Sequence, residues 1–144
     1  MTVKNIICGI CAAIGGYISY LLGGFTADLV TLILFMVIDF LMGLALALIF
    51  HRSSKTETGT LSSSAAFKGI IKKIAELMFV VIAQRLDIYL GCAFIKDAVI
   101  IGFIINELIS ITENAGLMGI TSPAIVEAID ILKKQVGGKN ENNR

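Results

Sequence analysis

Few side chains in this sequence are of the types that catalyse reactions, and their spacing suits none of the common mechanisms. Cys8-x-x-Cys11 has the spacing of a redox pair or half of a zinc site, yet the sequence has only one further cysteine, Cys92, and one histidine, His51. Because the cysteines lie in or beside apolar segments, we interpret them as small apolar residues of membrane helices. His51 directly follows an apolar run, which favours a residue at the membrane boundary over a catalytic base.

Serine and carboxylate chemistry find no better support. Ser62, Ser63 and Ser64 have no histidine in the same segment to activate a nucleophile. Glu107 and Glu113 lie six positions apart, a spacing that does not bring two carboxyl groups onto one helix face as a general acid–base pair. Phosphate-loop, nucleophile-elbow and zinc-protease motifs are absent from the sequence. We therefore predict that the protein is not an enzyme and uses no cofactor or metal ion.

The composition is that of an integral membrane protein. The chain has 144 residues, of which 56% are hydrophobic and 16% are charged, and its mean hydropathy is +0.87. Such a chain has room for about four membrane-spanning helices and no separate soluble domain. The formal net charge of +1 gives no general attraction for nucleic acid. We expect the lipid bilayer as a partner and no nucleic acid.

The most informative stretch is 29–50, in which Asp39 is the only ionisable residue. As a helix it is roughly 33 Å long, enough to cross a hydrocarbon core about 30 Å thick. A carboxylate at mid-bilayer costs about 2.5 to 3.5 kcal/mol, so Asp39 should face protein or water. Two interpretations remain open. Asp39 lines a pore or bonds across the small-residue groove at Gly43 and Ala47, or it is a protonated or internally paired acid that serves packing only.

A first membrane helix is predicted over 6–24. A cleavable signal peptide is the competing interpretation, because Lys4 precedes the apolar run. No small-x-small cleavage site is followed by a polar start, and a second hydrophobic span comes almost at once. We therefore expect the helix to be retained.

One face of this first helix carries small residues. They recur every four positions, at Cys11, Gly15, Ser19 and Gly23. This spacing places them on one side of a helix, where small side chains let two backbones approach closely. The pattern predicts a helix-packing face.

A hydrophilic loop, 51–64, separates the second span from a basic segment, 65–74. Lys68, Lys72 and Lys73 lie opposite the apolar residues of this segment. Lysines on one side of an amphipathic segment suit the cytoplasmic surface of a membrane, where anionic lipids attract them. We predict that these three lysines lie at the lipid interface.

The next two segments, 75–92 and 93–111, are apolar but interrupted by charges. Arg85 and Asp87 lie in the first and Glu107 in the second. The segments either cross the bilayer as a hairpin with their polar faces together, or lie partly in the interface. A salt-bridge cluster of Arg85 or Lys96 with Asp87 or Asp97 is plausible near the intervening turn. The remainder, 112–144, is predicted to be a cytoplasmic tail with an amphipathic helix beginning near Pro123.

The distribution of basic residues predicts the orientation. Ten of the twelve fall before the first helix, in the middle loop and basic segment, and in the tail: Lys4, Arg52, Lys55, Lys68, Lys72, Lys73, Lys133, Lys134, Lys139 and Arg144. With four spans, both termini and the middle loop are cytoplasmic. We therefore predict an all-α integral membrane protein of the bacterial cytoplasmic membrane, a multi-pass bundle of three or four transmembrane helices with a basic amphipathic cytoplasmic segment and an amphipathic C-terminal tail.

Several ordered motifs resemble the toxin-secretion and phage-lysis holin family over roughly 29–134. They are Asp39-Phe40-x-x-Gly43, Leu61-Ser62-Ser63, Phe67-Lys68-Gly69-Ile70-x-Lys72-Lys73 and Asn106-Glu107-x-x-Ser110-Ile111-x-Glu113-Asn114, followed by Gly119 and Pro123. The resemblance implies a protein of the bacterial cytoplasmic membrane, encoded by a bacterium or its phage, that forms homo-oligomers. Members of the family open lesions that release endolysins or large toxins.

We therefore expect a holin, with an antiholin, a membrane scaffold for another holin or a small channel subunit as alternatives. Residues predicted to serve oligomerisation or to line a pore are Gly15, Ser19, Gly23, Asp39, Gly43, Arg85, Asp87 and Glu107. Family members are often drawn with three spans, which leaves the side of the N terminus open.

Overall fold

The computed structural model describes residues 2–51, 62–120 and 122–137, which form helices joined by short turns and contain no strand. The helices are α1 (Val3–Leu21), α2 (Ala27–Ala45), α3 (Ser63–Leu90), α4 (Ile95–Leu117) and α5 (Pro123–Gly137), and α2 continues directly into a π-helical turn, Leu46–Phe50. Two of these helical stretches, Val3–Leu21 and Ala27–Phe50, are long and apolar enough to cross a membrane. The predicted all-α class is thereby confirmed, and the number of spans stays a prediction.

Helix ends follow local sequence signals. Gly91 ends α3 in the left-handed conformation with φ of 67°, and the next amide, that of Cys92, bonds back to the Asp87 carbonyl at 3.0 Å. Pro123 begins α5, where its missing N–H is not needed. Between α1 and α2, Gly23 and Gly24 have φ of 75° and 90°. The positive φ favours glycine at Gly23, where a Cβ would also displace the end of the Gln84 side chain of α3.

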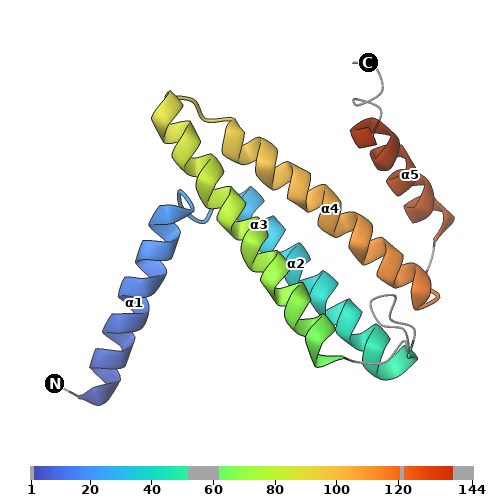
Figure 1. Ribbon diagram of the computed structural model, residues 1–144, viewed down its shortest axis with the longest axis horizontal. Coiled ribbons are helices and arrows are strands. Elements are labelled where there is room, and N and C mark those ends of the chain that lie inside the picture. The colour runs from blue at the N-terminus through green and yellow to red at the C-terminus, as the bar shows by residue number, and fades with distance from the viewer. Residues whose placement is uncertain (1, 52–61, 121, 138–144) are drawn as a thin grey trace.

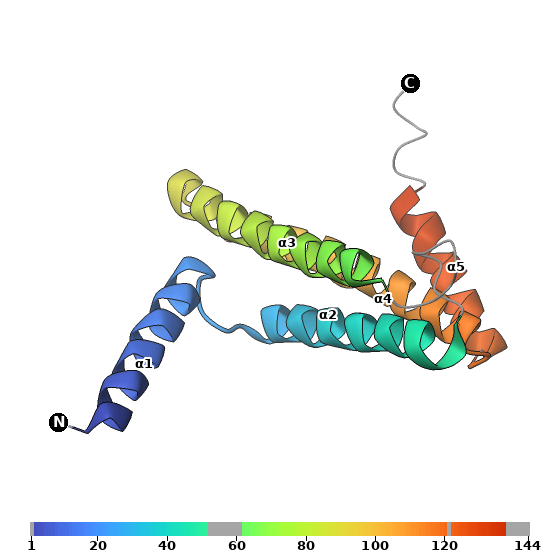
Figure 2. The same ribbon diagram turned by 60° about the horizontal axis from the view of Figure 1, so that its bottom comes forward.

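Three helices form a bundle and two project from it. α2, α3 and α4 run side by side, with α3 antiparallel to the other two, while α1 and α5 extend from opposite ends (Figure 1). The turned view also shows α1 pointing away from the bundle (Figure 2). α4 packs against both α2 and α3, whereas α2 and α3 touch each other much less. α4 is therefore the central element.

An apolar core occupies one half of the bundle. It is the half that contains the start of α2 and the turn between α3 and α4. The buried core residues are Leu22, Leu29, Leu32, Met36, Val80 and Ile100. Their spacing on α2, three and four residues apart, is the periodicity of a single helix face.

Two of the predicted segments are joined in the structure. The basic segment 65–74 and the apolar segment 75–92 form one continuous helix, α3, because no glycine–proline signal or polar break interrupts the run between them. The helix α4 extends beyond the predicted end at 111 to Leu117. The predicted loop 51–64 and the end of the tail fall mostly outside the described residues.

Candidate functional site

A cluster of polar side chains lies between the three bundle helices, with Asp39 of α2 at its centre. Oδ1 of Asp39 accepts hydrogen bonds from Ser110 Oγ at 2.6 Å and from Asn114 Nδ2 at 2.9 Å. Its Oδ2 accepts a bond from Lys73 Nζ at 2.9 Å. Only 4% of Asp39 is exposed. One carboxylate thus connects α2 to both α3 and α4.

Lys73 is the cation of this cluster. Its ammonium group lies 2.9 Å from Asp39 Oδ2 and 2.5 Å from Glu107 Oε2. The three residues come from three different helices, and the Glu107 side chain is 2% exposed. Charge-assisted bonds of this kind are stronger than neutral ones and allow a buried charge to remain ionised. Lys73 therefore connects α3 to both α2 and α4.

Glu76 adds a third carboxyl group. It lies on α3 one turn after Lys72, whose ammonium group is 3.7 Å from Glu76 Oε1. The Glu76 side chain is 7% exposed, whereas that of Lys72 is 66% exposed. The other oxygen, Glu76 Oε2, is buried and accepts no hydrogen bond from the described part of the chain. We use the name central cluster for Asp39, Lys73, Glu76, Glu107, Ser110 and Asn114.

The central cluster lies near the middle of the helices. Asp39 is about 18 Å from the start of α2 and about 17 Å from Phe50, at 1.5 Å per residue. The outer surface of the same bundle is apolar. Large exposed hydrophobic residues on α2 and α3 include Val30, Leu34, Val37, Leu41, Ile70, Ile71, Ile74, Met78, Phe79 and Ile82. The bundle thus buries polar groups between its helices and exposes large apolar residues, a pattern that suits lipid rather than water.

A second polar arrangement closes the turn between α3 and α4. The Asp87 carboxylate accepts bonds from the backbone amides of Ile95 at 3.0 Å and Lys96 at 2.9 Å. These amides belong to the first turn of α4 and have no partner within that helix. The Cys92 thiol donates to Asp87 Oδ1 at 3.1 Å, and this bond to the carboxylate raises the pKa of the thiol. Asp87 therefore caps α4 from the end of α3.

The sequence suggested a salt bridge between Asp87 and a basic residue at this turn, but the structure shows other contacts for Asp87. Its partners are backbone amides and a thiol, and the Arg85 side chain is exposed. The sequence shows charged residues near Asp87, but the folded turn brings the backbone amides of Ile95 and Lys96 to its carboxylate.

The other residues singled out in the sequence lie in different surroundings. No residue of α1 is buried, and Gly15 has open space around it. Gly23 instead lies against Gln84 of the same chain. Gly43 is half-buried, and Lys68 is exposed. Of the three lysines assigned to the lipid interface, Lys73 is the one whose ammonium group is held inside the bundle, between Asp39 and Glu107.

Sequence reasoning singled out Asp39 and Glu107 but did not join them to Lys73, Glu76, Ser110 and Asn114. A usable signal was present, because each of these residues continues a buried stripe of its own helix. Leu29, Leu32, Met36 and Asp39 lie on one face of α2. On α4 the spacing of Glu107, Ser110 and Asn114 is likewise that of one face. Polar residues in register with core positions indicate an internal cluster.

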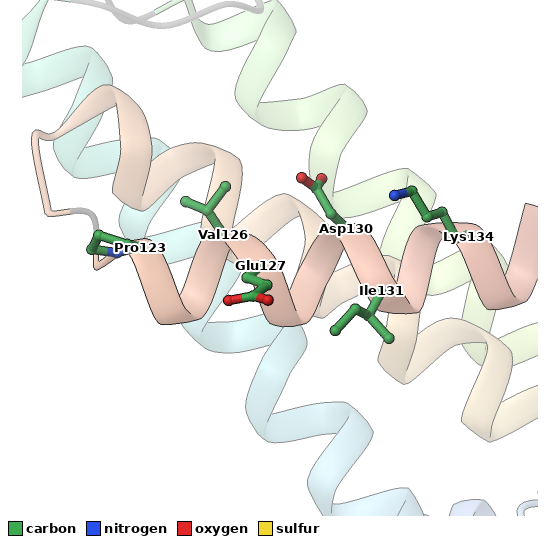
Figure 3. A pocket seen from close by; sticks show the side chains of 6 residues that line it. All are labelled: Pro123, Val126, Glu127, Asp130, Ile131 and Lys134. Carbon is green, nitrogen blue, oxygen red and sulfur yellow. The ribbon is translucent and has the colours of Figure 1, made fainter.

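A separate hollow of about 570 Å³ lies along α5, far from these groups in the sequence. Its lining residues are Pro123, Val126, Glu127, Asp130, Ile131 and Lys134 (Figure 3). Val126 and Ile131 are substantially exposed. None of the predicted site residues lines it. The hollow is a feature of the amphipathic C-terminal helix rather than of the central cluster.

The fold and the central cluster define a helical protein with an apolar outer surface and a polar cluster buried between its helices. Comparison with known sequences agrees with this class. The sequence profile of the bacteriophage holin family matches residues 16–134, and the chain belongs to that family. No solved structure matches the chain.

Relatives come from several bacteria. An uncharacterized protein of Listeria monocytogenes is 36% identical over 128 residues, which cover 88% of this chain and 86% of the relative. One from Halalkalibacterium halodurans is 36% identical, covering 85% of this chain and 90% of the relative. A Clostridium perfringens protein described by its position in the nagH 3′ region is 28% identical, covering 88% and 89%.

Proposed function

We propose that this protein is a holin, which assembles in the bacterial cytoplasmic membrane into openings that release an endolysin or a protein toxin. Membership in the bacteriophage holin family supports this function. The observation that carries the proposal is that Asp39, Lys73 and Glu107 are bonded inside a bundle whose outer surface carries large apolar side chains. A chain of this kind is suited to lipid, since its buried charged groups face one another inside the bundle and not the hydrocarbon.

The membrane arrangement follows from the order of the helices. In the proposed topology α2 crosses the membrane from the external side to the cytoplasmic side, so that the residues between α2 and α3 are cytoplasmic. α3 and α4 then cross as an antiparallel pair, and their polar faces meet in the central cluster. α5 lies on the cytoplasmic side, and α1 supplies a further span. This arrangement agrees with the excess of lysine and arginine in the cytoplasmic segments.

Homo-oligomers are proposed to form through surfaces that the single chain leaves uncovered. α1 has no buried residue, and its small residues at Gly15 and Gly16 meet nothing within 4 Å. Such faces allow close packing of helices in a bilayer. In an opening, polar groups of the central cluster would turn from their partners within one chain toward water. The lesion would then be lined by residues that are internally bonded in the closed bundle.

The test expresses the full chain from a tightly controlled promoter in a bacterium and follows two signals over time. Membrane potential reports any ion leak, and escape of a cytosolic enzyme reports openings large enough for proteins. We expect a lag, then abrupt depolarisation followed by enzyme release. Depolarisation without enzyme release would identify a small channel, and neither event would favour an antiholin or scaffold. Both results contradict the proposal.

A substitution connects the activity to the central cluster. Asp39→Leu removes the acceptor of bonds from Lys73, Ser110 and Asn114. We expect a clear change in the time of release or its loss. The matched control is Leu41→Ala on the same helix, where the side chain is 56% exposed. If Asp39→Leu and the unchanged chain release the enzyme at the same time, with equal amounts of protein in the membrane, the central cluster has no role in release.

A further inference from the structure

The central cluster contains more acidic than basic groups. Asp39, Glu76 and Glu107 each expose less than a tenth of the side chain, and the ammonium group of Lys73 lies between Asp39 and Glu107. Lys72 reaches the edge, 3.7 Å from Glu76, but its side chain is 66% exposed and therefore strongly screened. With its three carboxyl groups ionised, the central cluster would hold three negative charges against the partly buried ammonium group of Lys73. Such an excess is costly away from water.

The carboxyl groups differ in how well they are satisfied. Asp39 accepts bonds from Lys73, Ser110 and Asn114, so both of its oxygens have donors. Glu107 accepts a bond from Lys73 on Oε2. Glu76 Oε2 is buried without a donor among the described residues. The excess of negative charge therefore falls on Glu76.

The neighbour of Glu76 across the helix interface is another carboxyl group. Glu107 of α4 is bonded to Lys73, which lies three residues before Glu76 on α3, so the two buried carboxyl groups belong to the same cluster at the α3–α4 interface. The remaining charged groups around the pair are Asp39 from α2 and Lys72 and Lys73 from α3. Two carboxyl groups at such close range cannot both be ionised without strong repulsion. A single proton between them removes one charge and supplies the missing donor.

We propose that Glu76 and Glu107 form a proton-binding site in the interior of the bundle, where they share one proton that bonds α3 to α4. The proton comes from water and leaves to water, so no other reactant is needed. A proton requires only two oxygen ligands, whereas a cation such as Ca²⁺ takes about six to eight. The two facing carboxyl groups thus fit a proton. This site does not depend on the proposed function.

The proton contributes to the attachment of α3. This helix contacts α2 little and is held mainly by α4 and by the bonds of Lys73. Loss of the proton leaves two carboxylates facing each other across the α3–α4 interface. Raising the pH should therefore loosen α3 while leaving α2 and α4 packed together.

Infrared spectroscopy of the full chain in lipid vesicles tests the site directly. At neutral pH we expect a carbonyl band from protonated carboxylic acid equal to one group per chain, which disappears as the pH is raised. The band should be lost in Glu76→Gln, because the amide replaces the acid and supplies its own donor to Glu107. Glu127→Gln, at an exposed position of α5, is the matched control and should keep the band.

A measurement on the unchanged chain is sufficient to contradict the proposal, and the variants provide a second test. Absence of a protonated-acid band at neutral pH, with every carboxyl group ionised, would show that the proton is not bound. A band that persists in both Glu76→Gln and Glu107→Gln would place the proton elsewhere. If stability of the unchanged chain instead rises with sodium concentration at constant pH and no acid band is seen, the occupant is a metal cation.

Discussion

The two halves of the three-helix bundle are buried to the same degree by opposite chemistry. Near the turn between α3 and α4, the core consists of Leu29, Leu32, Val80 and Ile100, each with no exposed surface. Further along the helices, Asp39 and Glu107 occupy equivalent inward positions at 4% and 2% exposure. Burial alone therefore does not distinguish core from candidate site. The difference lies in what each half loses when a side chain is removed.

The apolar half depends on packing, which any well-fitting hydrophobic side chain can supply. The central cluster depends on complementary charges, and removal of one member leaves the others unpaired. Single substitutions in the apolar half should therefore lower the stability of the bundle gradually. Single substitutions in the central cluster should lower it sharply.

The largest effect is expected at Lys73. Lys73→Met leaves the carboxylates of Asp39 and Glu107 without their cation, at a cost of about 3–5 kcal/mol in the free energy of unfolding. The measurement is unfolding of the full chain by sodium dodecyl sulfate in mixed micelles, followed by circular dichroism.

The control is the neighbouring lysine. Lys72→Met removes an exposed ammonium group and should cost at most about 1 kcal/mol. Similar losses for the two lysines would mean that the pairs of Lys73 do not stabilise the bundle. A triple variant that also carries Asp39→Asn and Glu107→Gln should recover stability, because no buried charge is then left unpaired.

Next in size is Leu32→Ala in the apolar half. Leu32 is fully buried, and its truncation should cost about 2–3 kcal/mol, the lower part of the range for such cavities, because in lipid the loss is mainly of packing contacts. The same unfolding measurement applies. Leu34→Ala, at a side chain that is 54% exposed, is the matched control. If Leu32→Ala costs more than Lys73→Met, the contrast between the two halves is wrong.

A smaller effect is expected at the turn between α3 and α4. Asp87→Ala removes the acceptor for the amides of Ile95 and Lys96, which should cost about 1–2 kcal/mol as for the loss of a helix cap. Amide hydrogen exchange at Ile95 and Lys96 should accelerate before global unfolding. Asp97→Ala, an exposed acid in the first turn of the same helix, is the control. Unchanged exchange at both amides would exclude the capping role.

The smallest effect is expected at Ser110. Its hydroxyl donates one bond to Asp39 Oδ1, which Asn114 also serves. Bonds between helices in membranes contribute about 0.6 kcal/mol on average, so Ser110→Ala should cost little. Ser110→Ala combined with Asn114→Ala should cost more than the sum of the two, because neither donor is then left to compensate for the other at Oδ1. Simple additivity would show that the two donors act independently.

Much of the architecture could be predicted from sequence. The helical class and the apolar stretch around Asp39 follow from composition and length. The basic segment 65–74 and most of the apolar segment 75–92 lie in one helix, α3, so the change from a basic to an apolar surface occurs within that helix. Lys68, Lys72 and Lys73 look alike in sequence, yet helix rotation places Lys73 inside and Lys68 outside.

The sequence by itself determined that the chain forms helices and that these helices are suited to a lipid environment. A long apolar run with few charges must be helical in lipid, because every backbone group has to be bonded within the segment. Only the tertiary structure decided which polar residues meet. Asp39 and Lys73 are separated by 34 positions, and Asp39 and Asn114 by 75. Their contacts depend on the rotation and register of three helices, which are set jointly by the packing of all three.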